Sequence, residues 1–292
     1  MTGTGSTEQT SSRPRDDAVA QFQREFAELL IDRLRENKEA LQAQWANPSG
    51  TTTRSLVLDE LLPTQICGAI YAAFPQDTAG FRRLDTFRER KKTSADLTSY
   101  DPILEGIVYA FQDPRLVQLV AEIVGIRQLE PDPILYAGGL SMMLKDDFLN
   151  PHVDNSHDAR RQRYRRLNLL YYVSPEWTLE NGGNFELWDP TRSHPKVIVS
   201  RTNRLVVMET TKTSWHSVNK VNADRPRCCV SNYYFSKTSP DTTDYYHVTS
   251  FMGRPEERFR QVLGVIDNGL RNLISKTLKI TTGKVRKDRQ GK

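Results

Sequence analysis

Five segments between residues 166 and 236 decide the fold class of this chain: RLNLLYYVS (166–174), NFELWD (184–189), KVIVS (196–200), RLVVMET (204–210) and CCVSNYYFS (228–236). They are short and rich in Val, Leu, Tyr and Phe, and turn formers such as Asn181-Gly182-Gly183 separate them. A sixth segment, at 134–145, precedes them. Such spacing is typical of a closed or double-sheet antiparallel structure rather than of a parallel α/β sheet.

Helical patterns flank this β region on both sides. Over residues 19–44, apolar side chains recur at three- and four-residue intervals, which predicts a helix. Asp101-Pro102 and Asp113-Pro114 each predict a helix start, because Asp caps a helix N-terminus and proline fits its first position. Gly125 is expected to end the second of these helices, and a last helix is expected over 255–278.

The resulting division of the chain has five parts. They are a disordered N-terminus (1–17), a helical N-terminal region packed on the core (18–133), the β core (134–240), a C-terminal helical segment (241–282) and a basic tail (283–292).

Composition limits the classes of partner and compartment. The 292 residues are 37% hydrophobic and 26% charged, without an apolar run long enough for a membrane span or a secretory signal. Three cysteines cannot form a disulfide framework, so a reducing, cytoplasmic location is expected. The net charge of +5 is concentrated in the last ten residues, which hold five basic residues and one acidic residue. The rest of the chain therefore lacks the excess of positive charge that is typical of a nucleic-acid-binding surface. Neither a membrane nor a nucleic-acid partner is expected.

Three residues form a candidate metal site. His152 and Asp154 lie two apart in an extended segment, so their side chains leave the same face and can hold one ion. His216 follows the segment 204–210, and the intervening chain is long enough to cross the β core and return. Two imidazoles and one carboxylate on one metal face suit Fe(II) and leave three coordination positions open.

The same donor set leaves two other functions open. A zinc hydrolase also uses two histidines and a carboxylate, although the chain has no His-Glu-x-x-His helix to supply a general base. A catalytically inactive cupin-like binding module is the second alternative. Arg227, which opens the last strand, could pair bidentately with a carboxylate ligand, and a hydrolase gives this residue no role.

The order of these motifs resembles that of a known family. Pro151-His152-Val153-Asp154-Asn155, Asn181-Gly182-Gly183, Trp215-His216-Ser217-Val218 and Val230-Ser231-Asn232-Tyr233-Tyr234-Phe235 are similar to motifs of the Fe(II)/2-oxoglutarate dioxygenases. The prolyl 4-hydroxylase-like branch resembles them most. The resemblance covers roughly residues 134–236, and it implies a double-stranded β-helix (jelly-roll, cupin-like) core.

The resemblance also implies a reaction and its cofactors. His152, Asp154 and His216 become the ligands of Fe(II), with 2-oxoglutarate and O2 as cosubstrates and ascorbate as an optional addition. The implied enzyme hydroxylates an unactivated C–H bond of an amino acid, a peptidyl-proline or a biosynthetic small molecule, and it releases succinate and CO2. A carboxylate at Asp154 favours hydroxylation, since the halogenases of the family have a small residue there.

Two further residues are implied for the cosubstrate. Arg227 is expected to bind the distal carboxylate of 2-oxoglutarate, with Arg225 as the rival because loop length alone does not fix the register. Arg227, which opens the last strand and shares strand parity with Ser231, is favoured. Tyr172 matches the tyrosine that donates a hydrogen bond to the same carboxylate in the family.

The last expectations concern the substrate and partners. Arg160, Arg161 and Arg163 belong to a run of arginines just after the metal pair, and the hypothesis is that they recruit an anionic substrate. The alternative is a solvated charged loop. The leading helix over 19–44 could serve as the surface of a homodimer.

Overall fold

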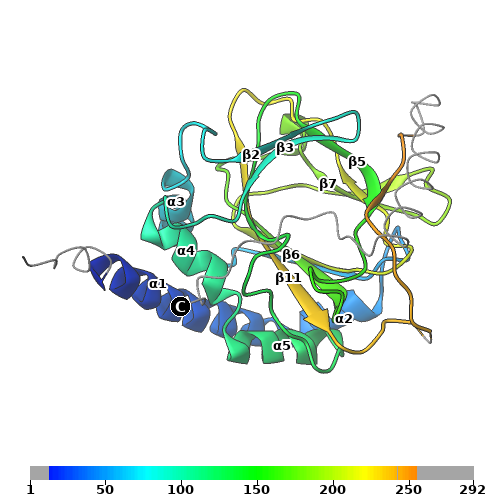
Figure 1. The fold of residues 1–292 in the computed structure, drawn as a ribbon, viewed down its shortest axis with the longest axis horizontal. Coiled ribbons are helices and arrows are strands. Elements are labelled where there is room, and N and C mark those ends of the chain that lie inside the picture. Colours follow the sequence, from blue (N-terminus) through cyan, green and yellow to red (C-terminus); the bar gives the residue numbers. More distant parts are fainter. Residues whose placement is uncertain (1–12, 242, 255–292) are drawn as a thin grey trace, which may run out of the picture.

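The computed structural model describes residues 13–241 and 243–254, and its centre is a sheet of antiparallel strands (Figure 1). The strands are β1 (Ser55–Asp59), β2 (Arg82–Asp85), β3 (Glu89–Ser94), β4 (Gly139–Met143), β5 (Phe148–Val153), β6 (Tyr164–Tyr172), β7 (Phe185–Trp188), β8 (Pro195–Ile198), β9 (Arg204–Glu209), β10 (His216–Val218), β11 (Arg227–Ser236) and β12 (Ser250–Phe251). The helices are α1 (Arg13–Glu36), α2 (Lys38–Ala46), α3 (Thr64–Ala72), α4 (Pro102–Ala110) and α5 (Pro114–Val124), with a 3-10 turn at Leu179–Asn181.

The strand order is β1-β9-β6-β11-β4-β3-β5-β10-β7-β8, while β2 pairs with β3 and β12 pairs with β5. Strand β3 pairs with both β4 and β5, so it joins the half of the sheet built on β6 and β11 to the half built on β5 and β10. This is the jelly-roll core with flanking helices that the sequence predicts.

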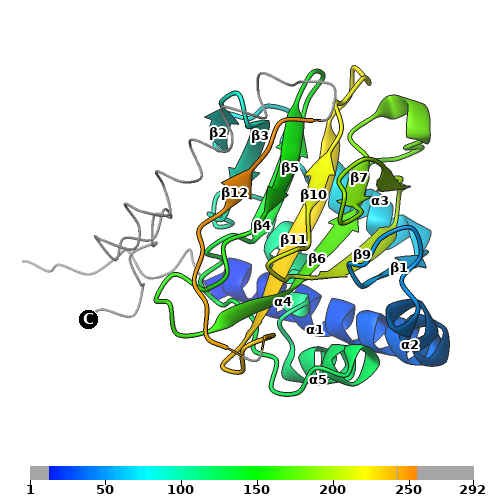
Figure 2. The same ribbon diagram turned by 90° about the vertical axis from the view of Figure 1, so that its right-hand side faces the viewer.

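Successive side chains along the strands point alternately to an outer face and an inner face of the sheet. On β6, Leu167, Leu169 and Tyr171 pack in the hydrophobic cluster that includes the helices. Asn168 and Leu170 point to the other face and line a cavity. Figures 1 and 2 show α1, α4 and α5 along the outer side of β6 and β11, which leaves the inner face for chemistry.

The predicted helix signals act as expected. The side chain of Asp101 accepts a hydrogen bond from the Ile103 backbone N–H at 2.9 Å, and Asp113 accepts one from Arg115 at 2.8 Å. Gly125 ends α5 with φ of +66°, a left-handed conformation that favours glycine.

Three expectations for the N-terminal half are corrected. Helix α1 begins at Arg13, so residues 13–17 are helical rather than disordered. The region 18–133 is not only helical, because β1 pairs with β9, and β3 pairs with β4 and β5. The expected helix over 19–44 is interrupted at Asn37, between α1 and α2.

The C-terminal expectations are only partly covered. Residues 243–254 form no helix, and their short strand β12 lies beside β5 (Figure 2). The predicted helix over 255–278 and the basic tail lie outside the described residues. Among the helices that the structure describes, none combines the length and the apolar character that crossing a membrane requires.

Candidate functional site

Two histidines face each other across neighbouring strands. His152 on β5 lies opposite His216 on β10, and their ring centroids are 4.1 Å apart. Asp154 follows the end of β5, two residues after His152. The ligand atoms of the three side chains all lie within 4.8 Å of one another. The chain thus brings the predicted candidate ligands together, and their spacing allows one metal ion to be shared.

Backbone contacts orient both imidazoles. Nδ1 of His152 lies 3.0 Å from the Asn150 carbonyl oxygen, and Nδ1 of His216 lies 2.9 Å from that of Ser214. A carbonyl can only accept, so Nδ1 carries the proton when each ring is neutral and Nε2 keeps its lone pair for a metal. Burial, and then the neighbouring His152, lower the pKa of His216 to about 3, which keeps this ring neutral at physiological pH.

Asp154 is held by a cation and an amide. Burial by itself raises its pKa, but Arg165, followed by the two histidines, brings the pKa well below the usual range. Oδ2 of Asp154 lies 3.2 Å from Nη1 of Arg165 and accepts a hydrogen bond from Nδ2 of Asn168 at 2.7 Å. The carboxylate is therefore ionised and fixed, as a metal ligand must be.

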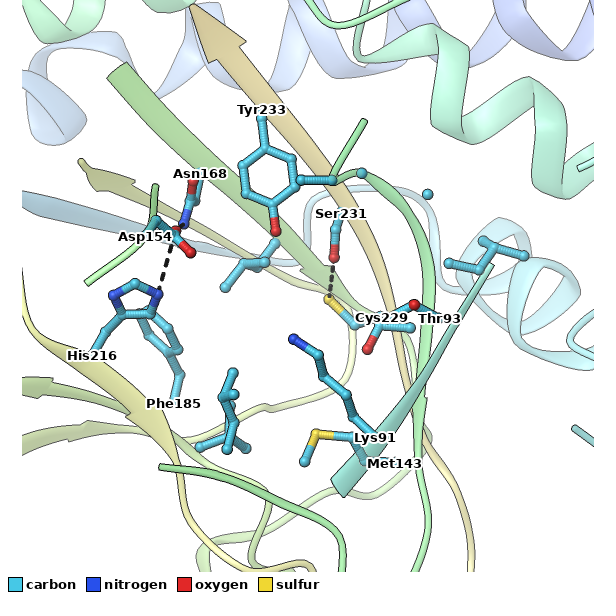
Figure 3. Close-up of a pocket in the computed structure, with 18 of the residues that line it drawn as sticks. Lys91, Thr93, Met143, Asp154, Asn168, Phe185, His216, Cys229, Ser231 and Tyr233 are labelled. Atoms are coloured by element: carbon cyan, nitrogen blue, oxygen red, sulfur yellow. Dashed lines mark hydrogen bonds and ion pairs between the residues drawn. The ribbon is translucent and has the colours of Figure 1, made fainter. Parts of the chain in front are cut away.

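The three side chains open into a cavity on the inner face of the sheet (Figure 3). Arg227 lines the same cavity, is buried, and donates from Nε to the Ser200 hydroxyl at 3.1 Å. No acidic side chain in the described ranges forms an ion pair with Arg227. A buried cation of this kind is costly unless an anion accompanies it, so the cavity is suited to a carboxylate ligand.

Tyr172 lies next to this arginine. The Arg227 guanidinium carbon is 4.6 Å from the centroid of the Tyr172 ring. The tyrosine hydroxyl is buried and has no hydrogen-bond partner within the described part of the chain. Burial also raises the pKa of this phenol, so it stays protonated and can donate to an anion.

The Asn-Gly-Gly motif makes room for Arg227. Gly183 has φ of +61°, and a Cβ there would lie 2.7 Å from Cδ of Arg227 and 2.9 Å from Cγ2 of Val221. Its carbonyl accepts a hydrogen bond from the Ser200 hydroxyl at 2.8 Å, and the oxygen of that hydroxyl accepts from Arg227. Gly183 therefore both admits and positions the arginine.

Gly183→Ala is expected to weaken carboxylate binding through Arg227. The added methyl group displaces the arginine side chain, and the left-handed backbone costs roughly 1 kcal/mol of stability for a non-glycine residue. The affinity for 2-oxoglutarate, measured by titration, is expected to fall, although by less than in an Arg227 variant. The free energy of unfolding, measured in urea, is also expected to fall. Unchanged affinity in a destabilised variant would contradict this role for the glycine.

The other predicted residues lie elsewhere. Arg225 contacts Glu176, with Nη1 3.8 Å from Oε2, and it does not line the cavity. Arg163 contacts Asp158 at 2.8 Å and Glu130 at 3.0 Å. Arg160 and Arg163 line a separate depression on the surface, and the Arg161 guanidinium lies over the ring of Tyr246. The geometry thus groups Arg227 with the metal candidates and leaves the other four arginines outside the cavity.

Sequence reasoning missed several residues of the site. Arg165 and Asn168 contact Asp154, and Lys91 and Thr93 enter the cavity from β3. Asn168 could have been found from the sequence, because it lies on the same face of its strand as Tyr172. No sequence pattern pointed to Lys91, because its strand falls in the region that was expected to be helical.

The buried His216 predicts a pH-dependent stability for the metal-free protein. An unfolded histidine titrates near pH 6.5, whereas the pKa of folded His216 is about 3. Below about pH 6.5 the unfolded chain binds a proton that the folded chain does not, so the free energy of unfolding falls as the pH decreases. This residue is expected to contribute about 1 kcal/mol between about pH 7.5 and about pH 5.5. Urea unfolding of wild type and His216→Gln tests this, since an equal decrease in both would contradict it.

Comparisons with known proteins agree with this geometry. Residues 138–235 match the model of the 2OG-Fe(II) oxygenase superfamily. No curated protein matches the sequence. The fold is similar to that of a prolyl-4-hydroxylase from Pseudomonas putida, with a TM-score of 0.51, 14% identity, and coverage of 68% of this chain and 98% of that chain.

A second similar structure is from Phytophthora capsici, in a study of its prolyl 4-hydroxylases, with a TM-score of 0.50 and 15% identity. That comparison covers 87% of this chain and 78% of the other. At these identities the two likenesses show the fold, whereas the family match confirms the expected resemblance and the enzyme class, a 2-oxoglutarate-dependent oxygenase.

Proposed function

We propose that this chain, whose residues 138–235 match the 2OG-Fe(II) oxygenase superfamily, hydroxylates an unactivated C–H bond and converts 2-oxoglutarate to succinate and CO2. One observation carries the proposal. The three candidate metal ligands and a buried arginine without an acidic partner among the described residues line the same cavity.

The residues present fit an Fe(II) ion. His152 and His216 offer Nε2 atoms whose lone pairs are set by backbone contacts, and Asp154 offers an ionised carboxylate. Two imidazoles and a carboxylate on one face leave positions open for a bidentate cosubstrate and O2. When bound, the iron supplies the oxidising chemistry that breaks the C–H bond.

The rest of the cavity would bind and orient the cosubstrate. Arg227 would pair with the distal carboxylate of 2-oxoglutarate. Tyr172 does not line the cavity but lies against the arginine, and it would donate its hydrogen bond to the same group. Both side chains are rigidly placed, because Ser200 fixes the arginine and the arginine covers the tyrosine ring. Phe251 stacks on His152 with centroids 5.1 Å apart and helps to exclude water from the metal side.

The substrate is proposed as a class. Likeness in fold to prolyl 4-hydroxylases makes a proline or peptidyl-proline a reasonable first candidate. Other amino acids and biosynthetic small molecules are equally compatible, since one fold accepts many substrate pockets.

Succinate release tests the proposal. Purified protein with Fe(II), 2-oxoglutarate and ascorbate is incubated with L-proline, with a proline-rich peptide or with no substrate. Succinate that depends on both Fe(II) and 2-oxoglutarate supports an oxygenase. Hydrolysis of ester or amide substrates with zinc, and no succinate under any condition, would favour a zinc hydrolase. Absence of both activities would favour a binding module.

A further inference from the structure

We propose that Lys91 on β3 is a binding residue for the primary substrate, and that this substrate carries a carboxylate. The inference rests on the proposed function, because it assumes that 2-oxoglutarate occupies Arg227. Strand β3 lies outside the segment that matches the family.

The register of the sheet places Lys91 in the cavity. Lys92 pairs with Met142, so Lys91 falls in the same row as Met143, and Met143 pairs with Arg227. All three residues of this row line the cavity. Figure 3 shows the Lys91 side chain directed into it beside Met143.

Lys91 and Arg227 enter the cavity from two strands that β4 separates. Neighbouring strands are about 4.8 Å apart, so the two backbones are separated by about 10 Å, with Met143 between them. The Arg227 guanidinium has contacts of its own, with the Met143 sulfur at 3.4 Å and the Ser200 hydroxyl at 3.1 Å. One cation can therefore serve the cosubstrate and the other a second anion.

The charge balance of the cavity supports a second anion. Among the described lining residues, Lys91 and Arg227 are cations and Asp154 is acidic. With a divalent metal bound, Asp154 and the dianion 2-oxoglutarate leave one positive charge unbalanced. Two charges next to the lining offset each other, because Glu89 contacts Lys91 at 3.1 Å and Arg165 contacts Asp154 at 3.2 Å.

The contact with Glu89 positions the lysine without burying it. The side chains of Lys91 and Glu89 are 23% and 17% exposed, so neither is fully buried by their contact. An incoming carboxylate can share this ammonium group, which has three donors. Thr93, one step along the same face of β3, adds a hydroxyl to the same wall.

The test uses propionate as the probe and propionamide as its uncharged analogue of similar shape. Protein loaded with Mn(II) and saturating 2-oxoglutarate is titrated with each compound, and paramagnetic broadening of the proton resonances reports binding near the metal. Wild type is expected to broaden propionate more than propionamide. In Lys91→Met the affinity for propionate is expected to fall by about tenfold or more, because a charge-assisted hydrogen bond is lost.

Two variants serve as controls. Arg90→Met removes the neighbouring cation on β3, which contacts Asp85 on the other side of the strand and does not line the cavity. It is expected to behave like wild type, and Lys91→Arg is expected to retain binding of propionate.

Three results would overturn the proposal: equal broadening by acid and amide in wild type, unchanged propionate binding in Lys91→Met, or loss of 2-oxoglutarate binding in that variant. The last result would make Lys91 a cosubstrate residue. The proposed function is tested separately, by whether wild type with Fe(II) binds 2-oxoglutarate at all.

Discussion

His216→Ala is expected to lose Fe(II) binding and, with it, all succinate release. The substitution removes one of three ligands from a face where the other two are held in place by their own contacts, His152 by a backbone carbonyl and Asp154 by Arg165. Changes to residues that merely orient a metal ligand typically cost 10- to 100-fold in metal affinity, so the loss of a ligand itself is expected to exceed about 100-fold. Anaerobic Fe(II) titration, with protein-bound iron measured after gel filtration, gives the affinity directly.

A matched histidine variant guards against nonspecific effects. His194 is exposed and lies outside the cavity, so His194→Ala is expected to bind iron as wild type does. Circular dichroism of both variants shows whether the fold is retained. Full iron binding by a folded His216→Ala would contradict the assignment of this residue as a ligand.

Arg227→Met is expected to raise the KM for 2-oxoglutarate roughly tenfold to a hundredfold while leaving Fe(II) affinity unchanged. The range follows from the loss of a charge-assisted contact to a carboxylate. The fold is expected to tolerate the change, because removing a buried cation without an acidic partner among the described residues leaves no opposite charge unpaired. Initial rates of succinate release over a range of 2-oxoglutarate concentrations give both KM and kcat.

Arg225→Met is the internal comparison for that experiment. Arg225 contacts Glu176 outside the cavity, so its replacement is expected to leave the KM unchanged. The reverse outcome, with the larger increase in Arg225→Met, would show that the wrong arginine had been assigned.

The part of the site that sequence could predict depends on short-range geometry. His152 and Asp154 are two residues apart on an extended segment, and this period places both side chains on one face without knowledge of any partner strand. That period does not separate Arg225 from Arg227, which are also two residues apart; the structure brings Arg227 alone to the cavity, because β11 begins at Arg227 and Arg225 lies before it. Helix starts at Asp101 and Asp113 were predictable for the same reason, because a cap acts within one turn.

The part that sequence missed depends on pairing between distant segments. Strand β1 pairs with β9, and β3 pairs with β4 and β5, although nothing local in ERKKTS (89–94) indicates a strand that lines a cavity. Lys91 could therefore not be placed. The arginine run after the metal pair shows the same limit, since Arg165 belongs to β6 and contacts Asp154 rather than lying in a loop.

An anaerobic visible spectrum of the protein with Fe(II), titrated with 2-oxoglutarate, tests the central claim most directly. If the three ligands hold Fe(II) and Arg227 orients 2-oxoglutarate for bidentate binding, a weak charge-transfer band will appear in wild type. The band will be absent in His216→Ala and will require more 2-oxoglutarate in Arg227→Met. A folded, iron-loaded wild type that shows no band at saturating 2-oxoglutarate would contradict the account.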